Sequence, residues 1–122
     1  FLILYTICGK GKMDIEIKKG EKAVVVSLKG RMDAVTAPEL EKKVGGLINE
    51  GANCFIINLR DLVYMSSAGL RVILVLAKKL KPGNGKLLIS DLTGVVKEVF
   101  DVSGFATILQ IYETEDEALK QI

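Results

Sequence analysis

Two adjacent serines, Ser66 and Ser67, stand where a strand-like apolar run gives way to a helix-like run. The segment covering residues 57–74 reads INLRDLVYMSSAGLRVIL. A hydroxyl at the start of a helix lies beside unpaired backbone amides and the positive end of the helix dipole, so a phosphate added there is tolerated locally. A charge of about −1.5 to −2 would instead disrupt a partner packed against that turn. The pattern fits a phosphorylation switch, or plain capping of the helix by a serine.

The side chains that most enzymes use are scarce in this sequence. It contains no His, which removes the usual general base, the Ser-His and Cys-His nucleophile pairs and the commonest zinc ligand. A Ser-Lys pair involving Ser67 is disfavoured, because Lys78, Lys79 and Lys81 fall about 15 Å or more along the helix that Ser67 starts. Most hydrolase mechanisms therefore lack their central group in this sequence.

Motifs for binding metals and phosphates are weak. Asp33, Asp61 and Asp91 could be imagined as magnesium ligands, but no acidic pair is clustered at one strand end, and turn formation is the simpler interpretation. The glycine-lysine pieces at residues 9–12 and 83–86 lack the spacing of a nucleotide-binding P-loop. We expect no metal and no cofactor.

Composition places the chain among small folded domains. Its 122 residues are 49% hydrophobic and 26% charged, which suits one compact core. The formal charge of +2 comes from Lys10 and Lys12, Trp is absent and Arg occurs three times, so a nucleic-acid partner is not expected. Cys8 and Cys54 lie far apart, with Cys54 opening an apolar run. Together these features favour a reducing compartment and a cytoplasmic location.

Residues 1–12 differ from the rest of the chain. The run FLILYTIC followed by GKGK fits neither a signal peptide nor a membrane span, which needs about 20 apolar residues. We interpret it as an N-terminal extension, either artificial or translated from an upstream start, with an additional edge strand as the alternative. The domain is expected to cover residues 13–122, with no membrane partner.

The elements that position the serines follow from the hydrophobic pattern. Strands are expected at residues 14–18, 23–28, 55–59, 87–89 and 108–112, and helices begin near residues 36, 66, 93 and 114. The continuous apolar run at 55–59 suits a central strand covered on both faces. This alternation predicts an α/β fold with a mixed β-sheet of four to five strands and about four helices.

Local signals mark the helix ends. Thr36 with Glu39, and Thr114 with Glu117, have the spacing of capping boxes, and Gly51 is placed to end the first of these helices. The third helix is expected to bury an apolar side made of Val95, Val96, Val99 and Phe100.

Residues 13–122 resemble the STAS domain, the fold of bacterial anti-sigma factor antagonists. The family signature runs from an Asn-Leu strand end through an aromatic-Met pair and a serine turn to a Gly-Leu helix start. The matching residues here are Asn58, Leu59, Tyr64, Met65, Ser66, Ser67, Gly69 and Leu70. Residues 30–33 (GRMD) followed by Thr36 look like the family's Gly-x-x-Asp turn, and Asp91 and residues 100–104 also match.

The resemblance implies a binding switch. The unmodified protein would bind an anti-sigma factor that is also a serine kinase, release the sigma factor, and be inactivated by phosphorylation. A serine phosphatase would reverse the modification, and the domain itself would have no catalytic role, so it would not be an enzyme. In the family the phosphorylated serine stands two positions before the helix glycine, which selects Ser67, with Ser66 as second choice. The expected contact surface comprises Asp33, Thr36, Ser66, Ser67, Gly69, Leu70 and Arg71, with Leu70 and Arg71 on an exposed first turn and Gly69 admitting the partner's backbone.

One departure from the family leaves alternatives open. The best-studied branch has Asp immediately before the phosphorylated serine, whereas this chain has Ser66. One alternative is a STAS scaffold subunit of another complex, in which the serine is only structural. Another is a small-ligand or nucleotide-binding module that uses the same helix terminus.

Overall fold

The computed structural model describes residues 3–8 and 13–122. One six-stranded sheet follows chain order, β1-β2-β3-β4-β5-β6, antiparallel from β1 to β3 and parallel from β3 to β6. The strands are β1 (Ile3–Cys8), β2 (Met13–Lys19), β3 (Val24–Met32), β4 (Cys54–Met65), β5 (Lys86–Ser90) and β6 (Gln110–Tyr112). The helices are α1 (Ala37–Asn49), α2 (Ser67–Leu80), α3 (Gly94–Ser103) and α4 (Glu115–Leu119), with short 3₁₀ turns at Lys81–Gly83 and Phe105–Thr107.

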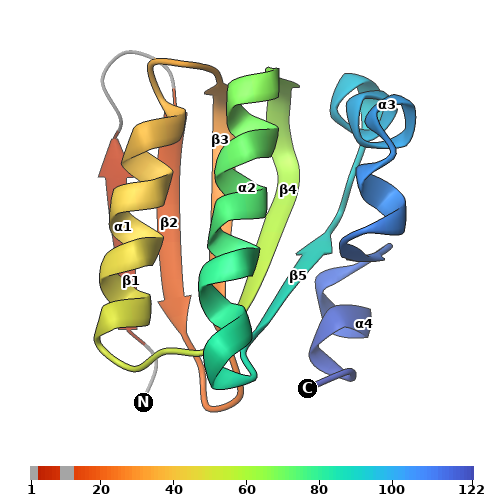
Figure 1. Ribbon diagram of the computed structural model, residues 1–122. Coiled ribbons are helices and arrows are strands. Elements are labelled where there is room, and N and C mark those ends of the chain that lie inside the picture. The colour runs from red at the N-terminus through yellow and green to blue at the C-terminus, as the bar shows by residue number, and fades with distance from the viewer. Residues whose placement is uncertain (1–2, 9–12) are drawn as a thin grey trace.

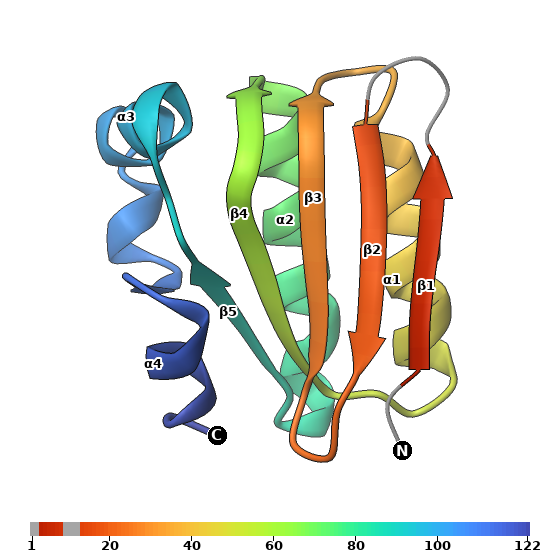
Figure 2. The same cartoon turned by 180° about the vertical axis from the view of Figure 1, so that it is seen from behind.

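The helices cover the two faces of the sheet unequally. Helices α1 and α2 lie side by side over one face, as Figure 1 shows, and the view from behind in Figure 2 shows the opposite face of β1 to β4. The main core lies under α1, α2 and α3 and includes Phe55, Ile57 and Phe100. A smaller core under α4 joins Val25, Ile56 and Leu88 to Ala118. The apolar run of β4 is thus covered on both faces, as predicted.

The predicted fold class is confirmed. From Met13 onward there are five strands and four helices in a mixed sheet, and β2 and β3 form an antiparallel hairpin. Strand β1 adds a sixth, edge strand from within the predicted extension, pairing Ile3 with Lys19 and Cys8 with Asp14. Residues 1–2 and 9–12 lie outside the described residues, and a domain boundary at Met13 remains a prediction.

One of the two motifs predicted for the ends of α1 forms and the other does not. Gly51 adopts φ +107°, and its amide donates to the carbonyl of Ile48 while that of Ala52 donates to Leu47, so the helix ends as predicted in a glycine-dependent motif. The Thr36–Glu39 capping box is wrong, because the Thr36 side chain makes no bond to the first turn of the helix.

The prediction for the start of α4 is confirmed, and the prediction for the apolar side of α3 is confirmed only in part. Thr114 does cap α4, accepting a hydrogen bond from the amide of Glu117 at 3.1 Å. In α3, Val96 and Phe100 are buried as predicted, but Val95 is 54% exposed. The helix therefore turns a narrower apolar side to the core than its valine-rich start suggested.

Strand β4 extends beyond the predicted strand, to Met65. Its pairing with β3 shifts register between Ser27 and Lys29 and again between Gly30 and Arg31. Such bulges insert residues and bend a strand without ending it. The strand therefore delivers the chain directly into α2. Among the described residues, no helix is both long and apolar enough to cross a membrane.

Candidate functional site

The start of α2 lies against the end of β3. Met32 and Met65 are register partners at the ends of β3 and β4, and the amide of Ser66 donates to the carbonyl of Met32 at 2.9 Å. Figure 1 shows α1 and α2 both beginning at the end of the sheet where β3 and β4 finish. The loop containing Asp33 and the turn containing Ser67 therefore share one end of the molecule, as expected.

Asp33 organises the loop between β3 and α1. Its carboxylate accepts hydrogen bonds from the amide of Val35 at 2.9 Å and the amide of Thr36 at 3.1 Å. The bond from the Thr36 amide, followed by that from Val35, holds the pKa of the Asp33 carboxyl below its ordinary value. The carboxylate is therefore charged at neutral pH and fixed toward its own loop.

Thr36 lies inside the domain rather than on a contact surface. It is 1% exposed, and its hydroxyl donates to the carbonyl of Arg31 while accepting from the amide of Asp33, both at 2.9 Å. Because the hydroxyl closes the loop in this way, it is not available to the helix or to a partner. The expectation that Thr36 contacts a partner is wrong for its side chain.

The two serines differ in access. Ser66 is the residue before α2, with extended backbone at φ −94° and ψ 174°, and its hydroxyl oxygen is buried with no hydrogen-bond partner. Ser67 is the first residue of the helix and is exposed. The capping interpretation predicts a side-chain bond to the first turn, and Ser66 makes none. The exposed hydroxyl is thus that of Ser67.

Gly69 and Leu70 are buried and pack inside the domain. A Cβ at position 69 would come within 3.0 Å of Met32 Cγ and 3.1 Å of Met65 Cγ, so the missing side chain lets α2 approach the ends of β3 and β4. Leu70 is only 6% exposed and belongs to the main core. The expected exposed turn is therefore wrong for Leu70, and Gly69 admits the domain's own methionines. Of the pair Leu70 and Arg71, only Arg71 is exposed.

Two exposed valines at this end of the domain were not predicted from the sequence. Val35 and Val63, from the loop after β3 and the end of β4, are 71% and 66% exposed. The Arg31 guanidinium lies 4.2 Å from the centre of the Tyr64 ring, a cation–π contact across the paired strands. Val63 falls where the register of β4 shifts, so strand alternation alone could not have shown which way it faces. Val35, by contrast, is an apolar residue in the loop beside Asp33, and the sequence alone indicates such a candidate for an exposed apolar contact.

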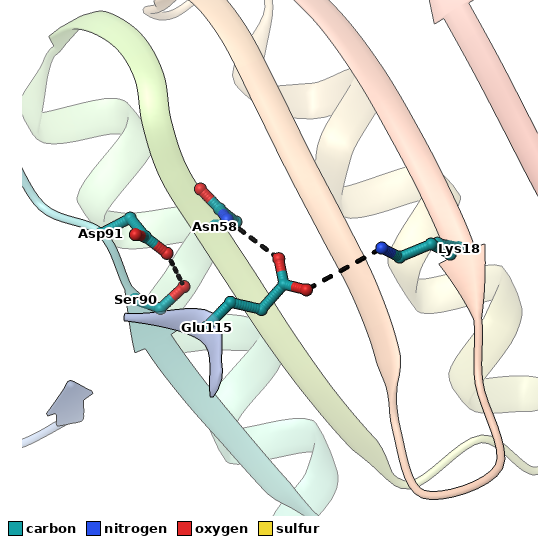
Figure 3. Close-up of polar contacts among 5 residues, drawn as sticks. All are labelled: Lys18, Asn58, Ser90, Asp91 and Glu115. Carbon is teal, nitrogen blue, oxygen red and sulfur yellow. Dashed lines mark hydrogen bonds and ion pairs between the residues drawn. The ribbon is translucent and has the colours of Figure 1, made fainter. Parts of the chain in front are cut away.

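Asn58, a signature residue, has a structural role on the opposite face. Its side-chain amide donates to the Glu115 carboxylate at 2.9 Å, and Glu115 also lies 3.9 Å from the Lys18 ammonium (Figure 3). The Asn58 oxygen accepts from the amide of Arg60, inside the first bulge. Asn58 thus ties α4 to β4, and Glu115 links both to β2.

Acidic groups elsewhere form no metal site within the described part of the chain. No group of three or more His, Cys, Asp or Glu residues is arranged there to hold an ion. Asp91 directly follows β5 and accepts a hydrogen bond from the Ser90 hydroxyl at 2.8 Å (Figure 3). Its backbone adopts a left-handed φ of 59°. It is therefore a turn residue, as the simpler interpretation had it.

Comparisons with known proteins agree with this geometry. The STAS domain family matches residues 14–118. BtrV of Bordetella bronchiseptica, assigned as an anti-sigma factor antagonist, is 32% identical over 106 residues, covering 87% of this chain and 91% of that protein. The anti-sigma-B factor antagonist of Bacillus subtilis is 31% identical over 99 residues, covering 81% of this chain and 90% of that protein.

Solved structures share the fold. The crystal structure of an anti-sigma factor antagonist from Mycobacterium paratuberculosis aligns with TM-score 0.83 at 23% identity, covering 95% of this chain and 98% of that one. The unphosphorylated antagonist SpoIIAA aligns with TM-score 0.76 at 25% identity, covering 88% and 94%. Its phosphorylated form from Bacillus aligns with TM-score 0.69 at 24% identity, covering 88% and 97%. The chain belongs to the STAS domain family, among the non-enzymatic anti-sigma factor antagonists.

Proposed function

We propose that this protein is a phosphorylation-controlled anti-sigma factor antagonist. In its unmodified form it binds an anti-sigma factor, which then releases its sigma factor. The observation that carries the proposal is the exposed hydroxyl of Ser67 on the first turn of α2, beside the fixed Asp33 loop. The homologous antagonists, at about 30% identity, support the same type of partner.

The inactivating step is a phosphoryl transfer to Ser67. The γ-phosphoryl group of ATP moves to Ser67 Oγ, the bond to the β-phosphate oxygen breaks, ADP leaves, and the hydroxyl proton passes to a base of the kinase. All catalytic groups belong to the anti-sigma factor kinase. A serine phosphatase restores the hydroxyl by hydrolysis, releasing inorganic phosphate.

The buried oxygen of Ser66 favours Ser67 as the acceptor. An attacking hydroxyl must lie in line with the transferred phosphoryl group, which requires open space in front of its oxygen. The Ser67 side chain is exposed, whereas the Ser66 oxygen is enclosed at the junction of β4 and α2. Modification of Ser66 would require the start of α2 to open.

The phosphate is expected to change the surface and leave the fold intact. At the first turn of α2 it faces unpaired backbone amides and the positive end of the helix dipole, both of which accept negative charge. The proposed contact surface comprises exposed or half-buried residues at this end, namely Val35, Val63, Ser67, Arg71 and Asp33. A doubly charged group placed at the same end of the domain as the two valines disfavours the packing of an apolar partner surface there. These partners would place the protein in the cytoplasm.

The decisive experiment maps the modified residue. Purified protein, Ser67→Ala and Ser66→Ala are incubated with ATP and the serine-kinase anti-sigma factors of the source organism, and intact mass and peptide mapping follow. One phosphate that is lost only in Ser67→Ala supports the proposal. A phosphate that survives in Ser67→Ala, or no phosphate with any such kinase, contradicts the proposal and favours a STAS scaffold subunit.

A further inference from the structure

Ser67 and Arg71 lie one turn apart on the outer side of α2. Both residues are exposed, whereas Gly69 and Leu70 between them are buried. Residues four apart on a helix are neighbours, with about 5–6 Å between their Cβ atoms. The guanidinium group of Arg71 can therefore reach a group carried on Ser67 Oγ.

Arg71 has no competing partner in the described part of the chain. Within residues 3–8 and 13–122, no hydrogen bond, ion pair or ring contact engages its guanidinium. Arg31, the other arginine near this end, is stacked on Tyr64. Arg71 is thus a cation held close to Ser67 with its donors available.

No acidic group of the described residues engages Arg71. Asp33 is the acidic residue of the loop after β3, and its carboxylate accepts bonds from the amides of Val35 and Thr36 within that loop. On α2 itself, the first turn contains no acidic residue. Among the described residues, a phosphate on Ser67 would therefore be the first strong acceptor to engage Arg71.

We infer that Arg71 is the intramolecular counter-ion of phosphorylated Ser67. Arginine binds phosphate through two parallel N–H donors, a stronger arrangement than a single ammonium contact. The inference rests on the proposed function and deepens it. Phosphorylation then changes the contact surface twice, because it adds negative charge at Ser67 and pairs the Arg71 cation with that charge. Arg71 acts as a positioning residue that fixes the phosphate over the first turn.

The test measures the ionisation of the phosphate directly. Phosphoserine is introduced at position 67 by genetic code expansion, so that the result does not depend on any kinase, and ³¹P NMR follows its second ionisation against pH. The variants are Arg71→Gln and Arg71→Lys. The matched control is Lys78→Gln, which removes the same charge from an exposed position on α2, about 16 Å from residue 67.

A contact between Arg71 and the phosphate on Ser67 stabilises the doubly charged phosphate and so lowers its second pKa. We expect Arg71→Gln to raise the phosphate pKa by about half a pH unit, Arg71→Lys to raise it less, and Lys78→Gln to leave it within about 0.1 unit. Adding salt to about 0.5 M should shrink the Arg71→Gln effect. Equal values for wild type and Arg71→Gln, or an equal effect of Lys78→Gln, would overturn the inference. A failure of kinases to modify Ser67 would contradict the proposed function alone.

Discussion

The Ser67 end of the domain and the face under α4 are held together by different kinds of contact. At the Ser67 end the framework consists of backbone bonds, such as Ser66 amide to Met32 carbonyl, and of a loop closed by Asp33 and Thr36. On the opposite face, α4 is attached through side chains, because Asn58 is bound to Glu115 (Figure 3). A small apolar cluster that includes Ala118 adds to this attachment.

The difference explains how one end can carry a switch. Since Ser67 is exposed and none of these framework contacts involves its side chain, a phosphate can be added there without removing a structural contact. A charge added under α4 would instead break the contacts that attach the helix. Stability and binding should therefore respond to separate sets of residues.

The largest expected effect is on the free energy of unfolding, and it differs between two neighbouring residues of α2, Leu70 and Arg71. Leu70→Ala should lower the free energy of unfolding by about 3 kcal/mol, because Leu70 is buried in the main core. Arg71→Ala, its exposed neighbour, should change it by less than about 0.5 kcal/mol. Urea denaturation measures both. Similar losses for the two variants would contradict the assignment of Leu70 to the interior.

The next effect is on binding of the anti-sigma factor and concerns Val63, the exposed valine near the end of β4. Val63→Lys should weaken binding of the anti-sigma factor about tenfold, about 1.4 kcal/mol, since it places a charge in an apolar contact. The free energy of unfolding should be unchanged. Ile108→Lys is the matched control, because Ile108 is also exposed and lies just before β6, at the other end of the parallel strands. Calorimetric titration in which the two variants bind alike would place the contact surface elsewhere.

A smaller effect belongs to the α4 face. Asn58→Ala removes the hydrogen bonds to Glu115 and to the amide of Arg60. The loss should cost about 1 kcal/mol of stability, because water can still reach part of the half-buried Glu115 carboxylate. Affinity for the anti-sigma factor should not change. Chemical denaturation with a parallel binding titration tests both statements. A variant with intact stability but weaker binding would reverse the roles of the two regions.

The smallest effect is the pH dependence at Asp33. Its pKa is lowered in the folded state, so its contribution is fully present above the unfolded value of about 3.9 and is lost as pH falls through the folded value. The stability difference between wild type and Asp33→Asn should be constant above about pH 5 and shrink below about pH 4. Urea titrations at several pH values measure it. A difference that grows on acidification would contradict the hydrogen-bonded loop.

Sequence patterns predicted the fold better than the roles of single site residues. The hydrophobic pattern was sufficient for the doubly covered β4, and the glycine at position 51 was sufficient for the end of α1. Patterns could not show that Thr36 bonds backward to Arg31 instead of capping α1, because both uses of a threonine at a helix start look alike in sequence. Nor could they show that Gly69 faces Met32 and Met65, since close packing between distant segments leaves no local signal.

The central claim is that a phosphate on Ser67 abolishes binding without altering the fold. The most direct measurement compares unmodified protein with protein carrying phosphoserine at position 67, using affinity for the anti-sigma factor together with thermal unfolding. We expect affinity to fall at least about 100-fold, or about 2.7 kcal/mol, with the midpoint of unfolding nearly unchanged. Equal affinities for the two forms, or a loss of binding caused by unfolding of the modified protein, would contradict the claim.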